Sequence, residues 1–277
     1  MSNASTKIFA DGAKKDSIIE MYRNPLIAGF TTNPTLMVKA GITDYKAFAL
    51  DVLSTVTDKP ISFEVFSDDF EEMKLQALEI ASWGENVYVK IPITNTSGQS
   101  SVPLIRTLSW LGVKVNVTAI TLLSQVSAVM PALNPDTATY VSVFAGRIAD
   151  CGIDPLPTMQ RSLELVSRKP NTELIWASPR EVFNIAQARE IGCHIITVTD
   201  DLLKKLNLIG KDLQEMSLDT VKMFYRDAVS VGYSIETGPQ NEEAAAKKFL
   251  TRARIVSDVE SPKQTTAAKN DNNRRIS

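Results

Sequence analysis

Short apolar segments alternate with longer amphipathic segments along most of the chain. In several of the short segments apolar and polar residues alternate, which is typical of strands. Residues 113–119 are an example, because the valines face one way and the lysine, asparagine and threonine face the other. The pattern predicts eight strands, at residues 7–11, 26–31, 60–66, 87–93, 113–119, 140–145, 173–178 and 194–198.

The segments between the strands carry apolar residues at helical spacing. The clearest of these predicted helices spans residues 69–82. Its first residues are acidic, and negative charges stabilise the positive N-terminal end of a helix dipole. Between the strands, further helices are expected at residues 18–22 and 45–56 and in a segment that runs through Ala188. Beyond the last strand, helices are expected at 218–231 and 242–255.

This order of elements predicts the fold class. Strand–helix units with connections of about one helix each indicate parallel strands joined by crossovers, and eight such units close into a (β/α)8 TIM barrel. An open doubly wound sheet is the alternative, but it usually carries a glycine-rich phosphate turn after its first strand, and residues 11–14 are not one. We expect a barrel catalytic domain over 1–235, a C-terminal helical extension over 236–256 and a disordered polar tail over 257–277.

Composition narrows the class of protein. The chain has 277 residues, 44% of them hydrophobic and 22% charged, with a net charge of −2, which suits a globular protein with no nucleic-acid or anionic-membrane partner. No apolar run reaches the roughly 18 residues of a membrane helix, and the N-terminus has no secretion signal, so a cytoplasmic location is expected. Cys151 and Cys193 are not in C-x-x-C spacing, and the one histidine, His194, excludes a His-rich metal site.

The strand at 87–93 carries a lysine in its middle. Alternation places Tyr88, Lys90 and Pro92 on one face of this strand. An ammonium is costly to bury without a partner, so Lys90 either lies near a carboxylate or extends from the strand end with its stem on apolar surface. The other interpretation is that desolvation favours the neutral amine, which is a nucleophile toward ketones and aldehydes.

Polar side chains lie on, or directly after, seven of the eight predicted strands. A solvated strand end explains any one of them, but the whole set indicates a site, because barrel active sites collect at the C-terminal ends of the strands. The residues are Asp11, Asn33, Glu64, Lys90, Asn116, Thr118, Ser142, Arg147, Ser178 and Arg180.

These residue types suit one kind of chemistry. A neutral Lys90 can attack a carbonyl to form a Schiff base, and the protonated imine then allows the neighbouring carbon–carbon bond to break. A carboxylate, Asp11 or Glu64, can take the proton from the hydroxyl whose carbon leaves. The asparagines and serines can bind sugar hydroxyls, and Arg147 and Arg180 suit a phosphate, unless either arginine is paired with an acid.

The polar residues belong to stretches that resemble the transaldolase family. They are Phe-Ala-Asp at 9–11, Gly-Phe-Thr-Thr-Asn-Pro at 29–34, Tyr-Val-Lys-Ile-Pro at 88–92, Asn-Val-Thr at 116–118, Ser-Val-Phe-Ala-Gly-Arg-Ile at 142–148 and Ala-Ser-Pro-Arg at 177–180. The chain departs from the family at Gly12, where a serine or threonine is usual, and at Pro179, where a phenylalanine is usual.

The resemblance implies a class I Schiff-base enzyme on a (β/α)8 barrel that needs no metal or organic cofactor. It would move a dihydroxyacetone unit from a ketose phosphate to an aldose phosphate in the non-oxidative pentose phosphate pathway. It assigns the Schiff base to Lys90, the general acid/base to Asp11 and the catalytic water to Glu64 and Thr118. It assigns binding of the dihydroxyacetone unit to Asn33, Asn116 and Ser142. Binding of the phosphate is assigned to Arg147, Ser178 and Arg180.

Two other functions stay open. Related aldolases cleave fructose 6-phosphate outright, and they usually have glutamine and tyrosine where this chain has Glu64 and Phe144, so the resemblance favours transfer. A barrel that only binds sugar phosphates would keep the arginines without needing Lys90 or Asp11. The sequence leaves a homo-oligomer open as well.

Overall fold

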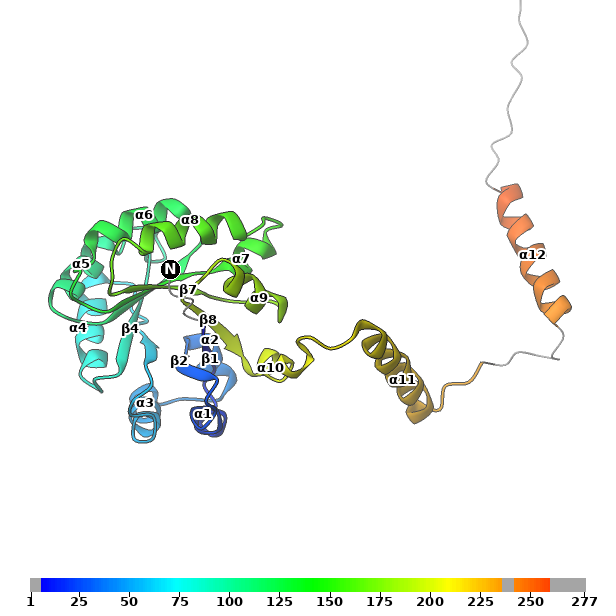
Figure 1. Cartoon of the computed structure of the whole chain (residues 1–277), viewed down its shortest axis with the longest axis horizontal. Coiled ribbons are helices and arrows are strands. Elements are labelled where there is room, and N and C mark those ends of the chain that lie inside the picture. Colours follow the sequence, from blue (N-terminus) through cyan, green and yellow to red (C-terminus); the bar gives the residue numbers. More distant parts are fainter. Residues whose placement is uncertain (1–5, 236–241, 260–277) are drawn as a thin grey trace, which may run out of the picture. The chain divides into compact units, whose positions relative to one another are not determined.

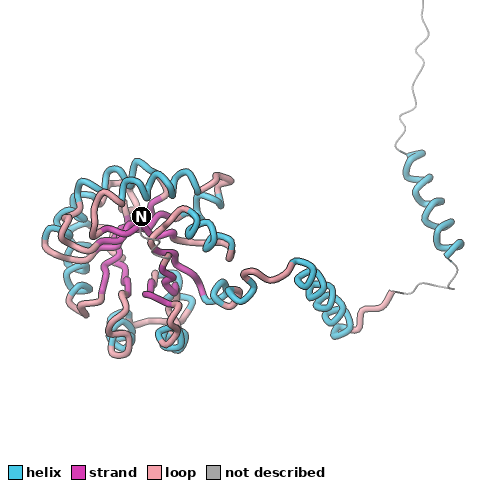
Figure 2. The backbone as a smooth tube through the Cα atoms, in the orientation of Figure 1, coloured by secondary structure: helices cyan, strands magenta, loops and turns pink. Residues whose placement is uncertain are grey.

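The computed structural model describes residues 6–235 and 242–259. Eight parallel strands form a closed barrel in the order β1 to β8, and helices surround it (Figures 1 and 2). The predicted (β/α)8 TIM barrel is therefore confirmed. The strands are β1 Lys7–Asp11, β2 Ile27–Thr31, β3 Ile61–Glu64, β4 Val87–Pro92, β5 Val115–Ile120, β6 Thr139–Val143, β7 Thr172–Trp176 and β8 Ile195–Thr199.

The helices follow the strands, and several begin at a side-chain cap. Asn33, Asp44 and Asp69 each accept a backbone N–H of the first helical turn through a side-chain oxygen. The helices are α1 Lys15–Tyr22, α2 Pro34–Lys39, α3 Tyr45–Leu53, α4 Phe70–Ala81, α5 Val102–Trp110, α6 Leu123–Val129, α7 Ala145–Asp150, α8 Leu156–Val166, α9 Phe183–Glu190, α10 Asp200–Leu203, α11 Leu213–Val231 and α12 Glu242–Val259, with short 3-10 turns at Met130–Ala132 and Leu206–Leu208.

Some predicted boundaries were wrong. The third strand was predicted over 60–66 but ends at Glu64. There the backbone N–H of Glu64 donates to the side-chain hydroxyl of Tyr45 and not to a neighbouring strand. Helix α11 begins before the predicted start at residue 218, because Asp212 caps its first turn. Helix α2 was not predicted, and α12 extends past residue 255. Residues 260–277 of the predicted tail lie outside the described residues.

An aromatic layer fills the barrel below the polar strand ends. The rings of Tyr88 and Tyr140 stack with centroids 4.0 Å apart, and Phe9 meets Tyr140 edge-on at 5.7 Å. Glycine at position 29 makes room for this ring, because a Cβ there would lie 2.6 Å from Phe9 and the ring would have to move. The buried Ile175 and other apolar side chains complete the layer, so the polar groups above it stand on a solid floor.

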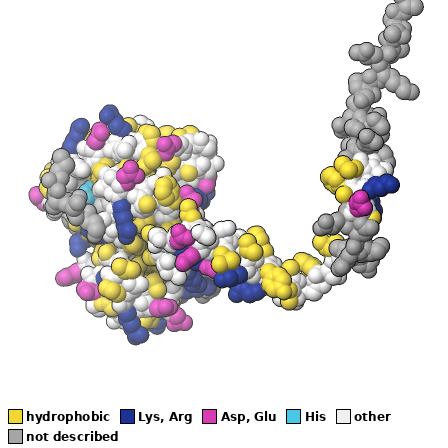
Figure 3. Space-filling model, turned by 45° about the vertical axis from the view of Figure 1, so that its right-hand side comes forward, with side chains coloured by type: hydrophobic (Ala, Val, Ile, Leu, Met, Phe, Trp, Pro, Cys, Tyr) yellow, Lys and Arg dark blue, Asp and Glu magenta, His cyan; other side chains and the backbone are white. Residues whose placement is uncertain are grey.

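The chain divides into two compact units, residues 1–211 and 212–277. In the second unit, none of the residues of α11 is buried, and the helix ends at Gly232 in the left-handed conformation that glycine favours. On the face of the barrel unit that Figure 3 presents, basic and acidic side chains are interspersed among apolar ones. Among the described helices, none is long and apolar enough to cross a membrane. The predicted domain ranges stay predictions.

Candidate active site

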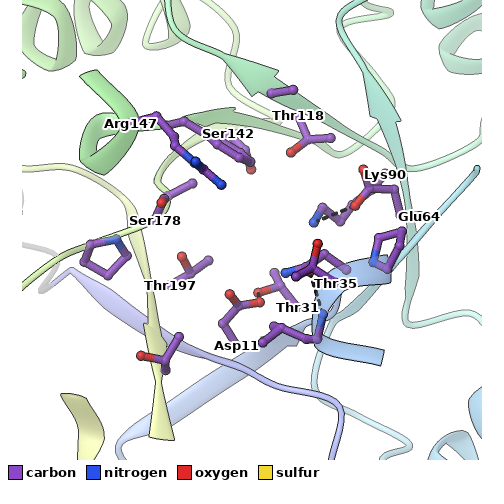
Figure 4. A pocket seen from close by; sticks show the side chains of 18 of the residues that line it. Asp11, Thr31, Thr35, Glu64, Lys90, Thr118, Ser142, Arg147, Ser178 and Thr197 are labelled. Atoms are coloured by element: carbon purple, nitrogen blue, oxygen red, sulfur yellow. Dashed lines mark hydrogen bonds and ion pairs between the residues drawn. The ribbon is translucent and has the colours of Figure 1, made fainter. Parts of the chain in front are cut away.

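A pocket of about 520 Å³ opens at the C-terminal ends of the strands (Figure 4). Every site residue predicted from the sequence lines it, with the exception of Asn116. The lining residues are Asp11, Thr31, Asn33, Pro34, Thr35, Leu36, Lys39, Glu64, Lys90, Thr118, Ala119, Ser142, Phe144, Arg147, Ala177, Ser178, Pro179, Arg180, Thr197 and Thr199.

Lys90 is buried inside the barrel, with 6% of its surface exposed. Its Nζ lies 3.1 Å from Oε2 of Glu64 and donates a hydrogen bond to the Thr32 carbonyl at 2.9 Å. Lys90 and Glu64 are opposite each other because β3 and β4 pair in that register. The lysine thus has a carboxylate neighbour, as one interpretation of the sequence expected, and that carboxylate is placed to accept a proton from it.

Asp11 ends β1 and faces the same pocket. Its Oδ1 accepts a hydrogen bond from the Thr31 hydroxyl at 2.8 Å, and Thr31 is its register partner on β2. Burial raises the pKa of Asp11 above its usual value, against the opposing effects of the Lys90 charge and the Thr31 hydrogen bond. A carboxyl with a raised pKa is suited to exchange a proton with a bound hydroxyl. Thr31 was missed in the sequence, although it alternates with Gly29 on the inner face of its strand.

Asn116 lies behind the pocket surface and is fully buried. Its side-chain oxygen accepts from the Ser142 hydroxyl at 2.7 Å, and its nitrogen donates to the Ser62 hydroxyl at 3.0 Å. It therefore orients Ser142 and does not itself face the pocket. Thr118 does face the pocket, and within residues 6–235 and 242–259 its buried hydroxyl has no hydrogen-bond partner. A ligand or a water can take that place.

The other side of the pocket carries two arginines. In Figure 4 the Arg147 side chain points from α7 into the pocket, close to Ser178. Arg180 is paired with Asp150: its Nε donates to Oδ1 at 2.8 Å, and its Nη2 donates to Oδ2. These hydrogen bonds, with the charge of the guanidinium, hold the pKa of Asp150 below its usual value. In the part of the chain described, Arg147 forms no ion pair, so the two arginines differ in the charge that they can offer an anion.

Residues of α2 and β8 extend the pocket beyond the predicted set. Thr197 and Thr199 follow the inward alternation of β8, which the sequence pattern could have revealed. Lys39 lies in the last turn of α2, a helix that was not predicted. Across the described residues, no three His, Cys, Asp or Glu side chains lie close enough together to hold a metal ion.

Comparisons with known proteins agree with this geometry. The family model described as transaldolase/fructose-6-phosphate aldolase matches residues 8–252. A probable transaldolase of Thermoanaerobacter sp. (strain X514) is 34% identical over 223 residues, which cover 80% of this chain and 98% of the relative. Probable transaldolases of Dehalococcoides mccartyi and Caldicellulosiruptor saccharolyticus are 34% and 37% identical, each over 72% of this chain and over 89% and 88% of their own lengths. The chain belongs to the transaldolase/fructose-6-phosphate aldolase family.

Proposed function

We propose that the protein is a transaldolase. It transfers a dihydroxyacetone unit from fructose 6-phosphate or sedoheptulose 7-phosphate to erythrose 4-phosphate or glyceraldehyde 3-phosphate, in the non-oxidative pentose phosphate pathway of the cytoplasm. The observation that supports this most strongly is the ion pair between the buried Lys90 and the partly buried Glu64, 3.1 Å apart, in the pocket that also holds Asp11 and Arg147. Family membership independently supports an enzyme of the aldolase or transaldolase type.

The proposed reaction begins at Lys90. Once Glu64 has taken a proton from its ammonium, Nζ attacks the ketose carbonyl carbon and forms a carbinolamine. Glu64 then returns the proton to the carbinolamine hydroxyl, which leaves as water and gives a protonated imine. Glu64 and the Thr118 hydroxyl hold the water that forms and later reverses this step. Both groups line the pocket beside Lys90, as this role requires.

Asp11 acts in the carbon–carbon cleavage. It takes the proton from the hydroxyl on C4, the C3–C4 bond breaks, and the electron pair moves into the imine to give an enamine while an aldose phosphate departs. In the second half, C3 of the enamine attacks the acceptor aldehyde and Asp11 returns the proton to the new hydroxyl. Hydrolysis of the imine then frees the product ketose.

The remaining residues bind substrate in this proposal. Asn33 and Ser142 bind the hydroxyls of the three-carbon unit, and Asn116 supports Ser142 from behind. Arg147, Ser178 and Arg180 bind the phosphate at the far side of the pocket. Phe144 contributes an apolar side chain to the wall of the pocket.

Direct cleavage of fructose 6-phosphate is the second candidate function. It uses the same imine and differs only in the fate of the enamine, which is protonated at C3 by water. Hydrolysis of the resulting imine then releases dihydroxyacetone and frees Lys90. Phe144 supports transfer, because an apolar ring at this wall of the pocket offers no hydroxyl to activate that water.

Borohydride trapping tests the proposal. The full chain is incubated with fructose 6-phosphate, reduced and mapped by peptide mass spectrometry, and a three-carbon adduct is expected on Lys90. Lys90→Met should abolish it, whereas Lys39→Met, which changes another lysine of the same pocket, should keep it. Erythrose 4-phosphate added before the reductant should accept the three-carbon unit from Lys90, so that no adduct is trapped. Free dihydroxyacetone in place of transfer would identify the aldolase, and an unlabelled Lys90 in the wild-type chain would overturn the Schiff-base mechanism.

A further inference from the structure

The hydroxyl of Tyr45 is bound to both backbone groups of Glu64. Its Oη donates to the Glu64 carbonyl at 2.9 Å and accepts from the Glu64 N–H at 2.7 Å. The ring is held by aromatic neighbours, with centroids 6.3 Å from Phe63, 5.4 Å from Phe66 and 5.9 Å from Trp83. Burial raises the pKa of Tyr45 above its usual value, so the hydroxyl keeps its proton and can donate and accept together.

This contact lies where the β2–β3 ladder stops. The strands are parallel, with Phe30 opposite Ile61. The Phe30 N–H donates to the Pro60 carbonyl at 2.8 Å, and the Thr32 N–H donates to the Ser62 carbonyl at 3.2 Å. In an evenly spaced parallel ladder, the next bond would join the Glu64 N–H to the Thr32 carbonyl.

That bond is replaced by two others. The Glu64 N–H donates to Tyr45, and the Thr32 carbonyl accepts Nζ of Lys90 at 2.9 Å. One side-chain hydroxyl therefore takes the position of the missing strand partner on Glu64. The Thr32 carbonyl is then not used by β3, and it accepts the hydrogen bond from Lys90 inside the barrel.

We propose that Tyr45 is a positioning residue, whose hydroxyl ends the β2–β3 ladder and thereby reserves the Thr32 carbonyl for Lys90 while fixing the backbone of Glu64. Tyr45 does not line the pocket and acts only through these two neighbours. Its importance for turnover rests on the proposed function, but its effect on Lys90 does not. In a chain without the hydroxyl, the Glu64 N–H would turn to the Thr32 carbonyl, and Lys90 would have to share that acceptor.

Reductive methylation of Lys90 in the full-length Tyr45→Phe variant tests the inference. Formaldehyde and cyanoborohydride modify the free amine, and peptide mass spectrometry gives the extent at each lysine as a function of pH. Loss of a hydrogen bond to the ammonium should move the Lys90 profile to lower pH by about one unit, with the other lysines unchanged. The charged groups that share the pocket stay in place: Asp11, Lys39, Glu64, Arg147 and Arg180.

Turnover supplies a second measurement. A misdirected Lys90 and Glu64 should lower kcat by roughly tenfold and change KM by less than about threefold, because the substrate-binding groups are untouched. The reactivity of Lys90 toward the small reagent would then rise as turnover falls. A general loss of structure would not produce this combination at a single lysine.

Two control variants separate the hydroxyl from other effects. Tyr22→Phe removes a hydroxyl that binds Asp58 at the exposed surface at 2.6 Å and should leave the profile unchanged. Phe66→Leu alters the ring packing of Tyr45 but keeps its hydroxyl, and it should also leave the profile unchanged. If Tyr45→Phe does not melt cooperatively, Tyr45→Met is measured in its place.

A folded Tyr45 variant whose Lys90 profile superimposes on that of the wild type would overturn the inference, as would an equal shift in Phe66→Leu. The methylation assay needs no sugar. Failure of the inference therefore differs from failure of the proposed function, which would appear as a wild-type Lys90 without a sugar adduct.

Discussion

The carbonyl oxygen of Ser178 lies where a side chain on Gly146 would have to be. Ser178 itself is in the left-handed backbone region, with φ of 61°, which is unusual for a residue that has a side chain. The loop after β7 therefore turns against the start of α7, and it can do so only because residue 146 lacks a Cβ. This contact fixes the distance between α7, which carries Arg147, and the loop that carries Arg180.

Gly146→Ala should weaken phosphate binding. Overpacking of this kind typically costs about 1–3 kcal/mol, which corresponds to a rise in KM for a phosphorylated sugar of roughly fivefold to 150-fold. The turnover of unphosphorylated dihydroxyacetone or fructose should change much less. Ala149→Ser, an exposed change on the same short helix, is the matched control. Equal losses on phosphorylated and unphosphorylated substrates would mean that the contact does not serve the phosphate.

The two arginines should differ in their effects. Arg147→Ala should raise KM for a phosphorylated substrate roughly a hundredfold, the upper range for a charge-assisted hydrogen bond. Arg180→Ala should raise it by less than about tenfold, because Asp150 already neutralises that guanidinium. Asp150→Asn should lower KM, since Arg180 then offers its full charge. Steady-state kinetics with Arg161→Ala, which changes an exposed arginine on α8, give the baseline. A larger effect of Arg180 than of Arg147 would contradict the prediction.

Thr31→Val should shift the pH dependence of the proposed reaction. The Thr31 hydrogen bond favours the ionised carboxylate of Asp11, so its loss should raise the pKa of Asp11 further. Asp11 must be ionised to accept the substrate proton. The acid limb of kcat/KM should therefore move to higher pH, by about one unit for a hydrogen bond to a charged group. Thr197→Val, a matched change on β8, should leave the limb in place, and an unmoved limb in Thr31→Val would argue against Asp11 as the base.

Glu64→Gln should lower the free energy of unfolding as well as the rate of the proposed reaction. Breaking a buried ion pair from one side typically costs about 3–5 kcal/mol, because the other charge stays buried. The matched surface change is Asp51→Asn, which removes the partner of Lys15 from an exposed pair and should cost less than about 1 kcal/mol. Urea unfolding of both variants at neutral pH measures the difference. Comparable midpoints for the two would mean that Lys90 relaxes into solvent.

Local pattern was sufficient where a single strand decides the position of a residue. Residues 7–11 form β1 as predicted, and Asp11 is at its end because apolar residues precede it without interruption. For β4 the alternation also correctly grouped Tyr88, Lys90 and Pro92 on one face of the strand.

Contacts between distant elements were beyond the sequence pattern. The alternation of 60–66 continues past Glu64, but β3 no longer pairs with β2 there, and the hydroxyl of Tyr45, from α3, binds both backbone groups of Glu64. The pairing of Arg180 with Asp150 joins the loop after β7 to the end of α7, which lie close together only once the barrel has formed. Asn116 lies on β5 as predicted, but its burial depends on hydrogen bonds to Ser62 and Ser142, which two other strands of the barrel contribute.

The aromatic layer below Lys90 has a consequence for the order of events. Phe9, Tyr140 and Ile175 are buried and close the barrel on that side, so that among residues 6–235 and 242–259 the pocket opens to solvent at the strand ends. In the proposed transfer, the departing aldose phosphate and the incoming one must use the same opening and the same phosphate-binding groups. The first product therefore has to leave before the second substrate can enter, and the covalently held three-carbon unit must wait in between, with the floor of packed rings protecting one side of it from water.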